Sequence, residues 1–460
     1  MPKLSEVIIN KFPFEATKGQ KILLTKLEEF IFRKDVGKST FLIKGFAGTG
    51  KTSLISTLVN VLPLFNLKFI LLAPTGRAAK VISNYSKRAA FTIHKKIYKS
   101  EIEADTGYTR FARQKNYHKN TIFLIDEASM IDERQEFAKK GLLNDLIDYV
   151  FENESNRMIL IGDTAQLPPV GQSESLALNE SYLESQYGLQ LEACQLTEVT
   201  RQKEGSGVLY NATHLREILN ADTKKIHITT KGFNDVFRMQ SEKLEDGLRY
   251  AYDKFGVENT IVVCRSNKTC FAYNQLIRRN LLFKEEMIEA GDLLMIVKNN
   301  YFYNESPAGF LANGDFVEIM KVVNFEEKYD ISYARLVIRM IDYPDYEPFD
   351  VLILMDSMFS NNLALPEDTE ERLRKAKKTE FDNSIEEIRK DQYMNALQVK
   401  FAYALTCHKS QGGQWDAVFV DQGYIKDDLV SNDYIRWLYT AITRSTNELY
   451  LVNFHEIFFS

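Results

Sequence analysis

The sequence contains little cysteine and no long hydrophobic run. Its four cysteines, Cys194, Cys264, Cys270 and Cys407, form no C-x-x-C pair, and no cysteine–histidine group has the spacing of a zinc site. This usage predicts reduced, mostly buried thiols in a cytoplasmic protein. No stretch of about 18 apolar residues is present, and the N-terminus lacks the apolar core of a signal peptide, so no membrane partner is expected.

A net positive charge is also missing. The 460 residues carry a net charge of −5, which excludes a uniformly basic nucleic-acid coat and confines any nucleic-acid site to a local groove. Hydrophobic residues make up 45% and charged residues 26%, as in soluble globular proteins. The length predicts about two to four domains, and no internal repeat or low-complexity tract interrupts them.

The recognisable motifs of the sequence are centred on one stretch, FLIKGFAGTGKTS, from Phe41 to Ser53. It joins a short apolar run to a helical pattern, and GFAGTGKT matches G-x-x-x-x-G-K-[ST]. Such a loop points backbone N–H groups at phosphate oxygens, and the helix N-terminus adds partial positive charge. Lys51 can reach the β- and γ-phosphates, and the Thr52 hydroxyl can ligate Mg²⁺. The predicted nucleotide-binding residues are Gly45, Ala47, Gly48, Thr49, Gly50, Lys51, Thr52 and Ser53.

A glutamine-centred feature precedes this loop. Residues 17–32 show the pattern of an amphipathic helix, and Gln20 follows Thr17 at the spacing of a T-x-x-Q capping box. The same carboxamide suits the N6/N7 edge of adenine, because it presents one donor and one acceptor. The residues alone leave both interpretations of Gln20 open.

Further apolar runs end in polar residues and alternate with helical patterns, which predicts parallel α/β sheets. The runs lie at residues 69–75, 122–126, 157–163, 259–264, 417–420 and 448–452. Asp126 could hold Mg²⁺, and Glu127 could orient and deprotonate an attacking water. Gln166 could hydrogen-bond a γ-phosphate or that water. The alternatives are a solvated strand end at Asp126 and Glu127, and a proline-stopped loop at Gln166.

Two segments interrupt the α/β pattern. Residues 95–120 interleave aromatic and basic side chains around an Asp-Thr-Gly turn, which predicts either a base-stacking hairpin or a basic surface hairpin. Short apolar runs within residues 291–360 predict a small antiparallel barrel or sheet, inserted in an α/β domain. Residues 366–394 are charged throughout and predict a solvated helix.

Near the C-terminus, two stretches carry candidate contacts. Residues 403–412, YALTCHKSQG, offer hydroxyl, amide and imidazole groups that suit phosphodiester contacts. The stretch YTAITR places Arg444 at the C-terminal end of a helix, from which it could reach the nucleotide of another domain.

The order of these stretches resembles superfamily 1 helicases, specifically the RecD/Dda-like branch and its compact, stand-alone members. The resemblance runs over nearly the whole chain. The matching stretches are Gln20 for the Q motif, GFAGTGKT for motif I, APTGRAA at 73–79 for Ia, Thr92-Ile-His94 for Ib, DEAS at 126–129 for II, GDTAQLPPV for III, LTEVTRQ at 196–202 for IV, HKSQG at 408–412 for V and YTAITR for VI.

The resemblance implies two RecA-like P-loop domains with parallel sheets that clamp ATP and Mg²⁺. The first would span residues 1–190 with the hairpin insertion at 95–120, and the second residues 191–290 and 396–460, with an SH3-like β domain at 291–395 between its parts. Lys51, Glu127 and Gln166 would act from the first domain, with Thr52 and Asp126 on the metal. Arg201 and Arg444 would act across the cleft. DNA would contact Pro74, Thr75, His94, Thr406, His408, Ser410 and Gln411, and Tyr108 and Phe111 in a duplex-splitting hairpin.

The activity implied is ATP-dependent, 5′-to-3′ movement on single-stranded DNA with separation of tailed or forked duplex, by a monomer, in replication, recombination or repair. The family usually has an acid in motif V at the position where this chain has Gln414. If this residue contacts the ribose, the contact is a hydrogen bond without a charge. Two alternatives remain: a P-loop ATPase that translocates or remodels nucleoprotein without separating strands, and a nucleotide-gated binding switch. Glu127, Gln166, Arg201 and Arg444 argue against the switch, because a switch need not hydrolyse quickly.

Overall fold

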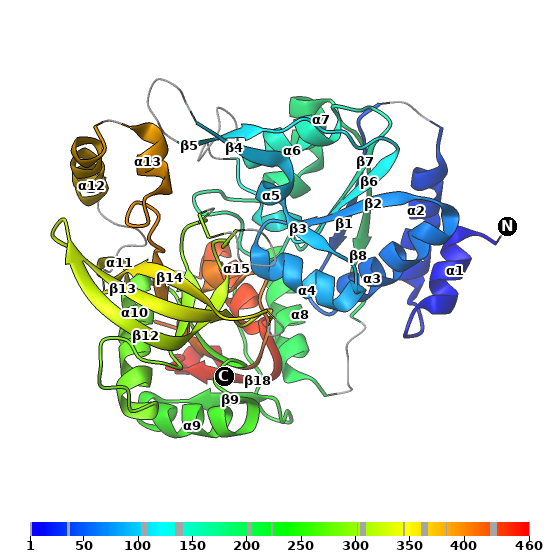
Figure 1. Ribbon diagram of the computed structural model, residues 1–460. Coiled ribbons are helices and arrows are strands. Elements are labelled where there is room, and N and C mark those ends of the chain that lie inside the picture. The colour runs from blue at the N-terminus through cyan, green and yellow to red at the C-terminus, as the bar shows by residue number, and fades with distance from the viewer. Residues whose placement is uncertain are drawn as a thin grey trace.

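A computed structural model describes most of the chain, and its strands group into three larger sheets and a two-stranded hairpin (Figure 1). The described residues are 2–34, 37–102, 109–133, 141–199, 205–221, 224–300, 302–303, 310–343, 346–359, 367–382, 384–423 and 430–459. Among the described helices, none is both long enough and apolar enough to cross a lipid bilayer.

The first sheet consists of parallel strands in the order β3-β2-β6-β7-β1-β8. These strands are β1 (Ser39–Gly45), β2 (Lys68–Ala73), β3 (Ala90–Thr92), β6 (Thr121–Ile125), β7 (Arg157–Gly162) and β8 (Gln190–Leu196). The apolar runs at 69–75, 122–126 and 157–163 are thus confirmed as parallel strands.

Helices cover both faces of this sheet. They are α1 (Leu4–Lys11), α2 (Lys18–Phe32), α3 (Lys51–Val61), α4 (Gly76–Ser86), α5 (Ile93–Ile97), α6 (Leu142–Val150) and α7 (Glu180–Tyr187), with short 3₁₀ turns η1 (Leu62–Phe65), η2 (Ala128–Met130) and η3 (Leu176–Leu178). Successive strand residues point to opposite faces: Phe41 and Ile43 pack among α1, α2 and α3, whereas Leu42 packs on the α6 side. Burial on both faces explains why these strands are apolar runs rather than alternating patterns.

The second sheet is also parallel, in the order β16-β10-β17-β18-β9. Its strands are β9 (Val236–Met239), β10 (Thr260–Cys264), β16 (Ala404–Thr406), β17 (Trp415–Asp421) and β18 (Ser445–Val452). The helical segments around it are α8 (Gly207–Leu219), η4 (Ser241–Lys243), α9 (Leu244–Phe255), α10 (Asn267–Leu276), η5 (Ile277–Leu281), α14 (Cys407–Ser410), α15 (Asn432–Ile442) and η6 (Glu456–Phe458). Two parallel α/β units confirm the predicted fold class.

Between β10 and β16 the chain forms an antiparallel sheet in the order β14-β13-β12-β11-β15, drawn mainly in yellow in Figure 1. Its strands are β11 (Leu293–Ile296), β12 (Phe316–Lys328), β13 (Ile331–Met340), β14 (Phe349–Leu354) and β15 (Val399–Phe401), followed or flanked by α11 (Met355–Phe359), α12 (Glu367–Glu380) and α13 (Ile385–Lys390). The inserted antiparallel sheet is therefore confirmed, while its SH3-like character stays a prediction.

The expected domain boundaries differ from the sheet edges at two points. Strand β8 pairs with β1, so the first sheet continues to Leu196, beyond the boundary expected at residue 190. Strand β15 pairs with β11, so the inserted sheet continues to Phe401, beyond the boundary expected at residue 395. Both strands lie at a sheet edge and are only partly apolar, so their sequences carry a weak strand signal.

The predicted hairpin is present as β4 (Tyr98–Ile102) paired antiparallel with β5 (Thr109–Arg113). Its turn lies outside the described residues.

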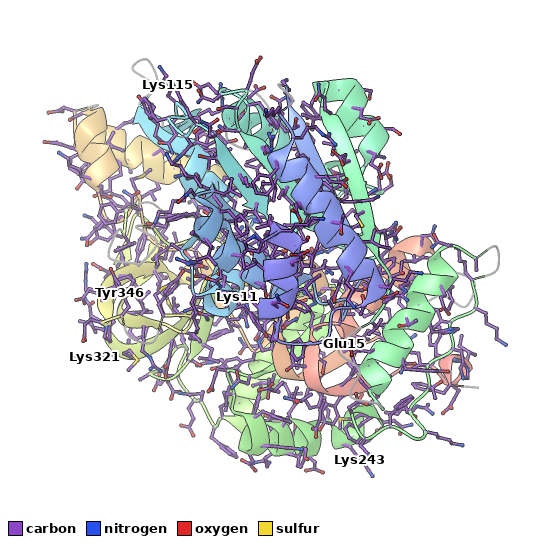
Figure 2. The ribbon with its side chains drawn as sticks, turned by 90° about the vertical axis from the view of Figure 1, so that its right-hand side faces the viewer. Lys11, Glu15, Lys115, Lys243, Lys321 and Tyr346 are labelled. Atoms are coloured by element: carbon purple, nitrogen blue, oxygen red, sulfur yellow. The ribbon has the colours of Figure 1, made fainter. Side chains whose placement is uncertain are left out.

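Charged side chains such as Lys115, Lys243 and Lys321 lie at the periphery of the molecule (Figure 2).

Candidate functional site

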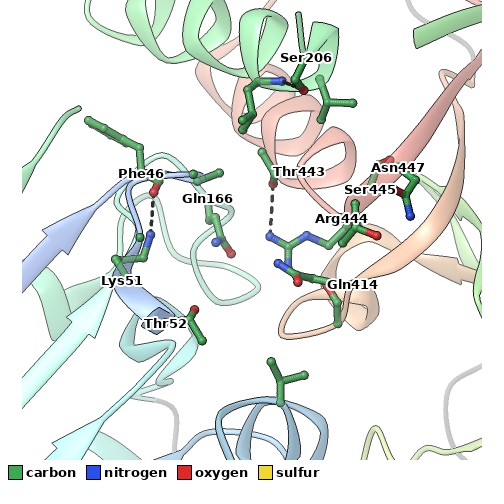
Figure 3. Close-up of a pocket in the computed structure, with 18 of the residues that line it drawn as sticks. Phe46, Lys51, Thr52, Gln166, Ser206, Gln414, Thr443, Arg444, Ser445 and Asn447 are labelled. Atoms are coloured by element: carbon green, nitrogen blue, oxygen red, sulfur yellow. Dashed lines mark hydrogen bonds between the residues drawn. The ribbon is translucent and has the colours of Figure 1, made fainter. Parts of the chain in front are cut away.

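The phosphate-binding loop lies between β1, which ends at Gly45, and α3, which begins at Lys51. Gly50 has φ 80°, a left-handed conformation that glycine adopts without a Cβ clash. The Lys51 ammonium lies over the loop and donates to the carbonyl oxygens of Gly45 at 2.5 Å and Phe46 at 2.8 Å (Figure 3). The strand–loop–helix arrangement expected from the motif is therefore present.

Gln20 connects the preceding helix to this loop. Its side-chain oxygen accepts from the backbone N–H of Thr17 at 3.0 Å, which completes the capping box of α2. Its Nε2 donates to the carbonyl of Thr49 at 3.0 Å, and the residue is buried. The capping interpretation is thus observed directly, and the same amide also contacts the phosphate loop.

Asp126 and Glu127 follow the buried strand β6 at its carboxyl end. Glu127 has φ 51°, a left-handed conformation uncommon for a residue with a side chain, and its N–H donates to Asp126 Oδ1 at 2.9 Å. Burial and the neighbouring Glu127 raise the pKa of Asp126 to about 7, against the attraction of Lys51. A carboxylate so placed favours a bound cation, and the oxygen donors of Asp126 and Thr52 fit the preference of Mg²⁺.

Gln166 lies in the loop after β7 and is only 5% exposed. Its side-chain oxygen is buried without a hydrogen-bond partner among the described residues. An unpaired buried acceptor is uncommon in folded proteins. Figure 3 shows the Gln166 amide directed into the space between Lys51 and Arg444.

Arg444 enters the same space from the second sheet, immediately after α15, and is only 4% exposed. Its guanidinium donates to the carbonyls of Thr440 at 2.9 Å and Gly413 at 3.2 Å, and to the Thr443 hydroxyl at 3.2 Å. All three partners are uncharged oxygen atoms, so they fix the orientation of the guanidinium but do not neutralise its positive charge. The predicted position at a helix C-terminal end is found.

Lys51, Thr52, Asp126, Glu127, Gln166 and Arg444 all line one cavity of about 700 Å³, a volume in the range of small-molecule sites. The predicted residue Arg201 lies outside the described residues. The cavity is also lined by residues that the sequence analysis did not single out, among them Tyr85, Ser206, Leu209, Asn234, Asp235 and Asn447. These belong to loops and helix ends with no motif of their own, so only the folded chain identifies them.

The predicted DNA contacts from motifs Ia and V lie next to each other. A side chain at Gly412 would come within 3.3 Å of the Thr75 hydroxyl, which itself caps α4 by accepting from the N–H of Ala78. Pro74 and Thr406 are half-buried. The two sets of residues, predicted from distant stretches, therefore share one edge of the molecule.

The two histidines of this set are also partly buried. Burial lowers the pKa of His94 to about 4 and lowers that of His408, so both imidazoles are neutral at pH 7. Any phosphate contact they make is a hydrogen bond rather than an ion pair.

The side chains of Ser410 and Gln411 are buried and already bonded within the protein. Ser410 donates to the carbonyl of Cys407 at 2.8 Å, and Gln411 donates to the carbonyl of Leu167 at 2.8 Å. In the hairpin, Tyr108 lies outside the described residues, and for Phe111 only the backbone, in β5, is described.

Comparison with known proteins agrees with this geometry. A model described as an AAA domain matches residues 33–229, and one described as a UvrD-like helicase C-terminal domain matches residues 401–452. The RecBCD enzyme subunit RecD of Buchnera aphidicola subsp. Schizaphis graminum is 23% identical over 471 aligned residues, which cover 95% of this chain and 72% of RecD. The ATP-dependent DNA helicase dda of Enterobacteria phage T4 is 24% identical over 469 residues, covering 95% of this chain and 99% of dda.

The fold also matches that of solved helicases. The crystal structure of Pif1 helicase from Bacteroides, in complex with ADP-AlF3 and single-stranded DNA, superposes with a TM-score of 0.50 at 16% identity, covering 97% of this chain and 95% of that chain. The matched models, the relatives and the fold converge with the order of the motifs along the chain. The chain therefore resembles the RecD-, Dda- and Pif1-type helicases of superfamily 1 in motif order, in matched domains and in fold.

Proposed function

We propose that this helicase uses ATP and Mg²⁺ to move 5′ to 3′ along single-stranded DNA and to separate the duplex ahead of it. The observation that carries the proposal is that Lys51 and Gln166, from the α/β unit of the first sheet, and Arg444, from that of the second, line one cavity. A nucleotide bound there would contact both sheets, so its hydrolysis would change how the two sheets are held together.

The residues have distinct parts in this proposal. Lys51 would leave the loop carbonyls for the β- and γ-phosphates, Glu127 would take a proton from the attacking water, and Gln166 would orient that water. Arg444 would stabilise charge developing on the transferred phosphoryl group. A Mg²⁺ held by Thr52 and Asp126 would supply the charge that neutralises the phosphate oxygens.

The track is proposed as single-stranded DNA lying over the edge where motifs Ia and V meet. One structural neighbour, the Pif1 helicase from Bacteroides, was crystallised with single-stranded DNA, which supports this choice. Glu127, Gln166 and Arg444 favour a motor over a nucleotide-gated switch. We also propose that the protein acts as a cytoplasmic monomer, in replication, recombination or repair.

Unwinding of a tailed duplex tests the proposal. With ATP and Mg²⁺, wild type should separate a duplex with a 5′ single-stranded tail and leave one with a 3′ tail intact. Lys51→Ala should abolish both strand separation and hydrolysis, because the phosphates lose their main point charge. Separation from the 3′ tail would contradict the polarity, and DNA-stimulated hydrolysis without separation would favour the remodelling ATPase.

Arg444→Ala tests the role of the second sheet. We expect ATP binding to persist and turnover at saturating ATP to fall about 10³-fold, as for other arginine fingers. Steady-state hydrolysis and equilibrium binding of a labelled nucleotide measure the two quantities separately. A weaker affinity with unchanged turnover would make Arg444 a binding residue instead.

A further inference from the structure

One face of α15 contacts the loop that carries Gln166. Arg436, Tyr439 and Thr440 have the i, i+3, i+4 spacing that places residues on one helix face. Arg436 donates to the carbonyl of Thr164, and the Thr440 hydroxyl accepts from the N–H of Leu167 at 2.8 Å. Since Arg444 follows the end of α15 and its Nε donates to the carbonyl of Thr440 at 2.9 Å, this helix connects the Gln166 loop with the arginine across the cavity.

Tyr439 extends this contact to the phosphate loop. Its side chain is 1% exposed, and its hydroxyl donates to Asp163 Oδ2 at 2.7 Å while accepting from the N–H of Ala47 at 2.8 Å. The other oxygen of Asp163 accepts from the N–H of Ala165 at 2.9 Å. One hydroxyl therefore bonds to two loops, after β1 and after β7, that are far apart in sequence.

The peptide group that Tyr439 contacts is also the one that Lys51 contacts. The Phe46 carbonyl accepts from Lys51 Nζ at 2.8 Å and from the Thr49 hydroxyl at 2.8 Å, while the N–H of the same peptide, on Ala47, donates to Tyr439. When Lys51 turns to a phosphate, the Phe46 carbonyl loses its hydrogen bond from Lys51 Nζ. The Tyr439 hydroxyl on the other side is therefore placed to respond to that change.

We propose that Tyr439 is a positioning residue, whose hydroxyl holds α15 in register with the phosphate loop so that Arg444 meets the transferred phosphoryl group. This proposal rests on the proposed ATP hydrolysis. Tyr439 acts through Ala47 and Asp163 and takes no part in the bond changes. Its loss should therefore lower turnover while leaving nucleotide affinity, which depends on Lys51 and Thr52, largely unchanged.

The chain provides a matched control on the same helix. Tyr434 is also buried in α15, but its hydroxyl has no hydrogen-bond partner in the described part of the chain. Tyr439→Phe and Tyr434→Phe therefore remove the same atom from the same helix, once with two partners and once with none. Any general effect of losing a buried hydroxyl appears in both variants.

The test is DNA-stimulated ATP hydrolysis by full-length wild type and the two variants. For Tyr439→Phe we expect kcat to fall about 10- to 100-fold, with KM for ATP changed less than about threefold. Tyr434→Phe should match wild type in both. Equal kcat in the two variants, or a rise in KM that accounts for the loss, would overturn the proposal.

A double-mutant cycle with Asp163→Asn provides a second readout. If the two residues act through one hydrogen-bond chain, the double variant should lose little more than the worse single variant. Fully additive losses would overturn the proposal. Wild-type turnover decides the proposed function separately: a wild type that does not hydrolyse ATP contradicts both, whereas an active wild type with an unaffected Tyr439→Phe contradicts only the role of Tyr439.

Discussion

The guanidinium of Arg278 is a buried charge at the junction of the second and inserted sheets. Its side chain is 3% exposed, and it forms a two-pronged contact with Asp292 at 2.9 and 2.8 Å. Tyr403 donates to the same carboxylate at 2.9 Å, and the guanidinium lies over the ring of Phe401. Such a pair is costly to break, because one charge is then left buried without a partner.

Arg278→Ala should lower the free energy of unfolding by about 3–5 kcal/mol, since Asp292 would remain buried and uncompensated. Chemical denaturation followed by tryptophan fluorescence measures the change. Arg279→Ala is the control, because its side chain is the next along the chain and is exposed. A loss no larger than that of the control would show that the pair contributes little to stability.

The site residues that sequence could predict are those whose role depends on local spacing. Lys51 follows its glycines directly, and Asp126 follows a strand, so a short window is enough. Tyr439 was part of a recognised stretch, but its function depends on Ala47 and Asp163, which no local pattern connects to it. The paired contacts of Gln20 illustrate the same limit, because the capping box was visible and the bond to Thr49 was not.

At the scale of elements, the charged segment 366–394 differs most from expectation. One solvated helix is expected there, whereas the structure has two helices, α12 and α13, and α12 is not solvated on all sides, because Lys377 is fully buried. Its ammonium bonds to Asp391 at 2.7 Å and Glu380 at 2.9 Å, and lies over the rings of Tyr329 and Tyr393. Composition shows that a segment is charged, but not which charge finds a partner elsewhere in the fold.

Lys377→Ala should loosen α12 and α13 without unfolding the rest of the chain. The carboxylate of Asp391 would lose its buried partner, at a cost of about 3 kcal/mol. Hydrogen–deuterium exchange should show protection within residues 371–382 falling by about a hundredfold. Lys378→Ala, with its exposed side chain, should leave protection unchanged. Equal exchange in both variants would contradict the role of Lys377.

The central strands are easier to predict from the sequence than those at sheet edges. Strands such as β6 and β10 are continuous apolar runs, because helices or other elements bury both faces. Strand β8 lies at an edge and mixes polar with apolar residues, and β3 and β16 are short. Their pairing is decided by the neighbouring strand rather than by their own sequence.

At the scale of the whole molecule, Arg77 joins all three larger sheets. It lies on α4 of the first unit, with its guanidinium carbon 4.3 Å from the ring centre of Phe316 in β12 and 4.1 Å from that of Trp415 in β17. A side chain at Gly413 would come within 2.8 Å of Arg77 Nε, so glycine permits this close approach. The stacked arginine therefore couples the inserted sheet to both parallel sheets.

Arg77→Ala should weaken the contacts among the three units. Desolvated cation–π contacts contribute about 2 kcal/mol, which corresponds to a fall of about 5 °C in the midpoint of the least stable unit. Differential scanning calorimetry should show the unfolding transition broadening or separating into components. Arg77→Lys should be intermediate, because an ammonium lacks the planar stacking surface. A single transition unchanged in midpoint would contradict this coupling.

The position of the inserted sheet also bears on how the chain folds. Strands β10 and β16 are neighbours in the second sheet, yet the entire inserted sheet separates them in sequence. The first and last strands of the insertion, β11 and β15, are themselves paired. Closing such a long loop directly is slow, because chain entropy is lost before contacts form. The antiparallel sheet should therefore form early and act as a template that brings the two halves of the second sheet together.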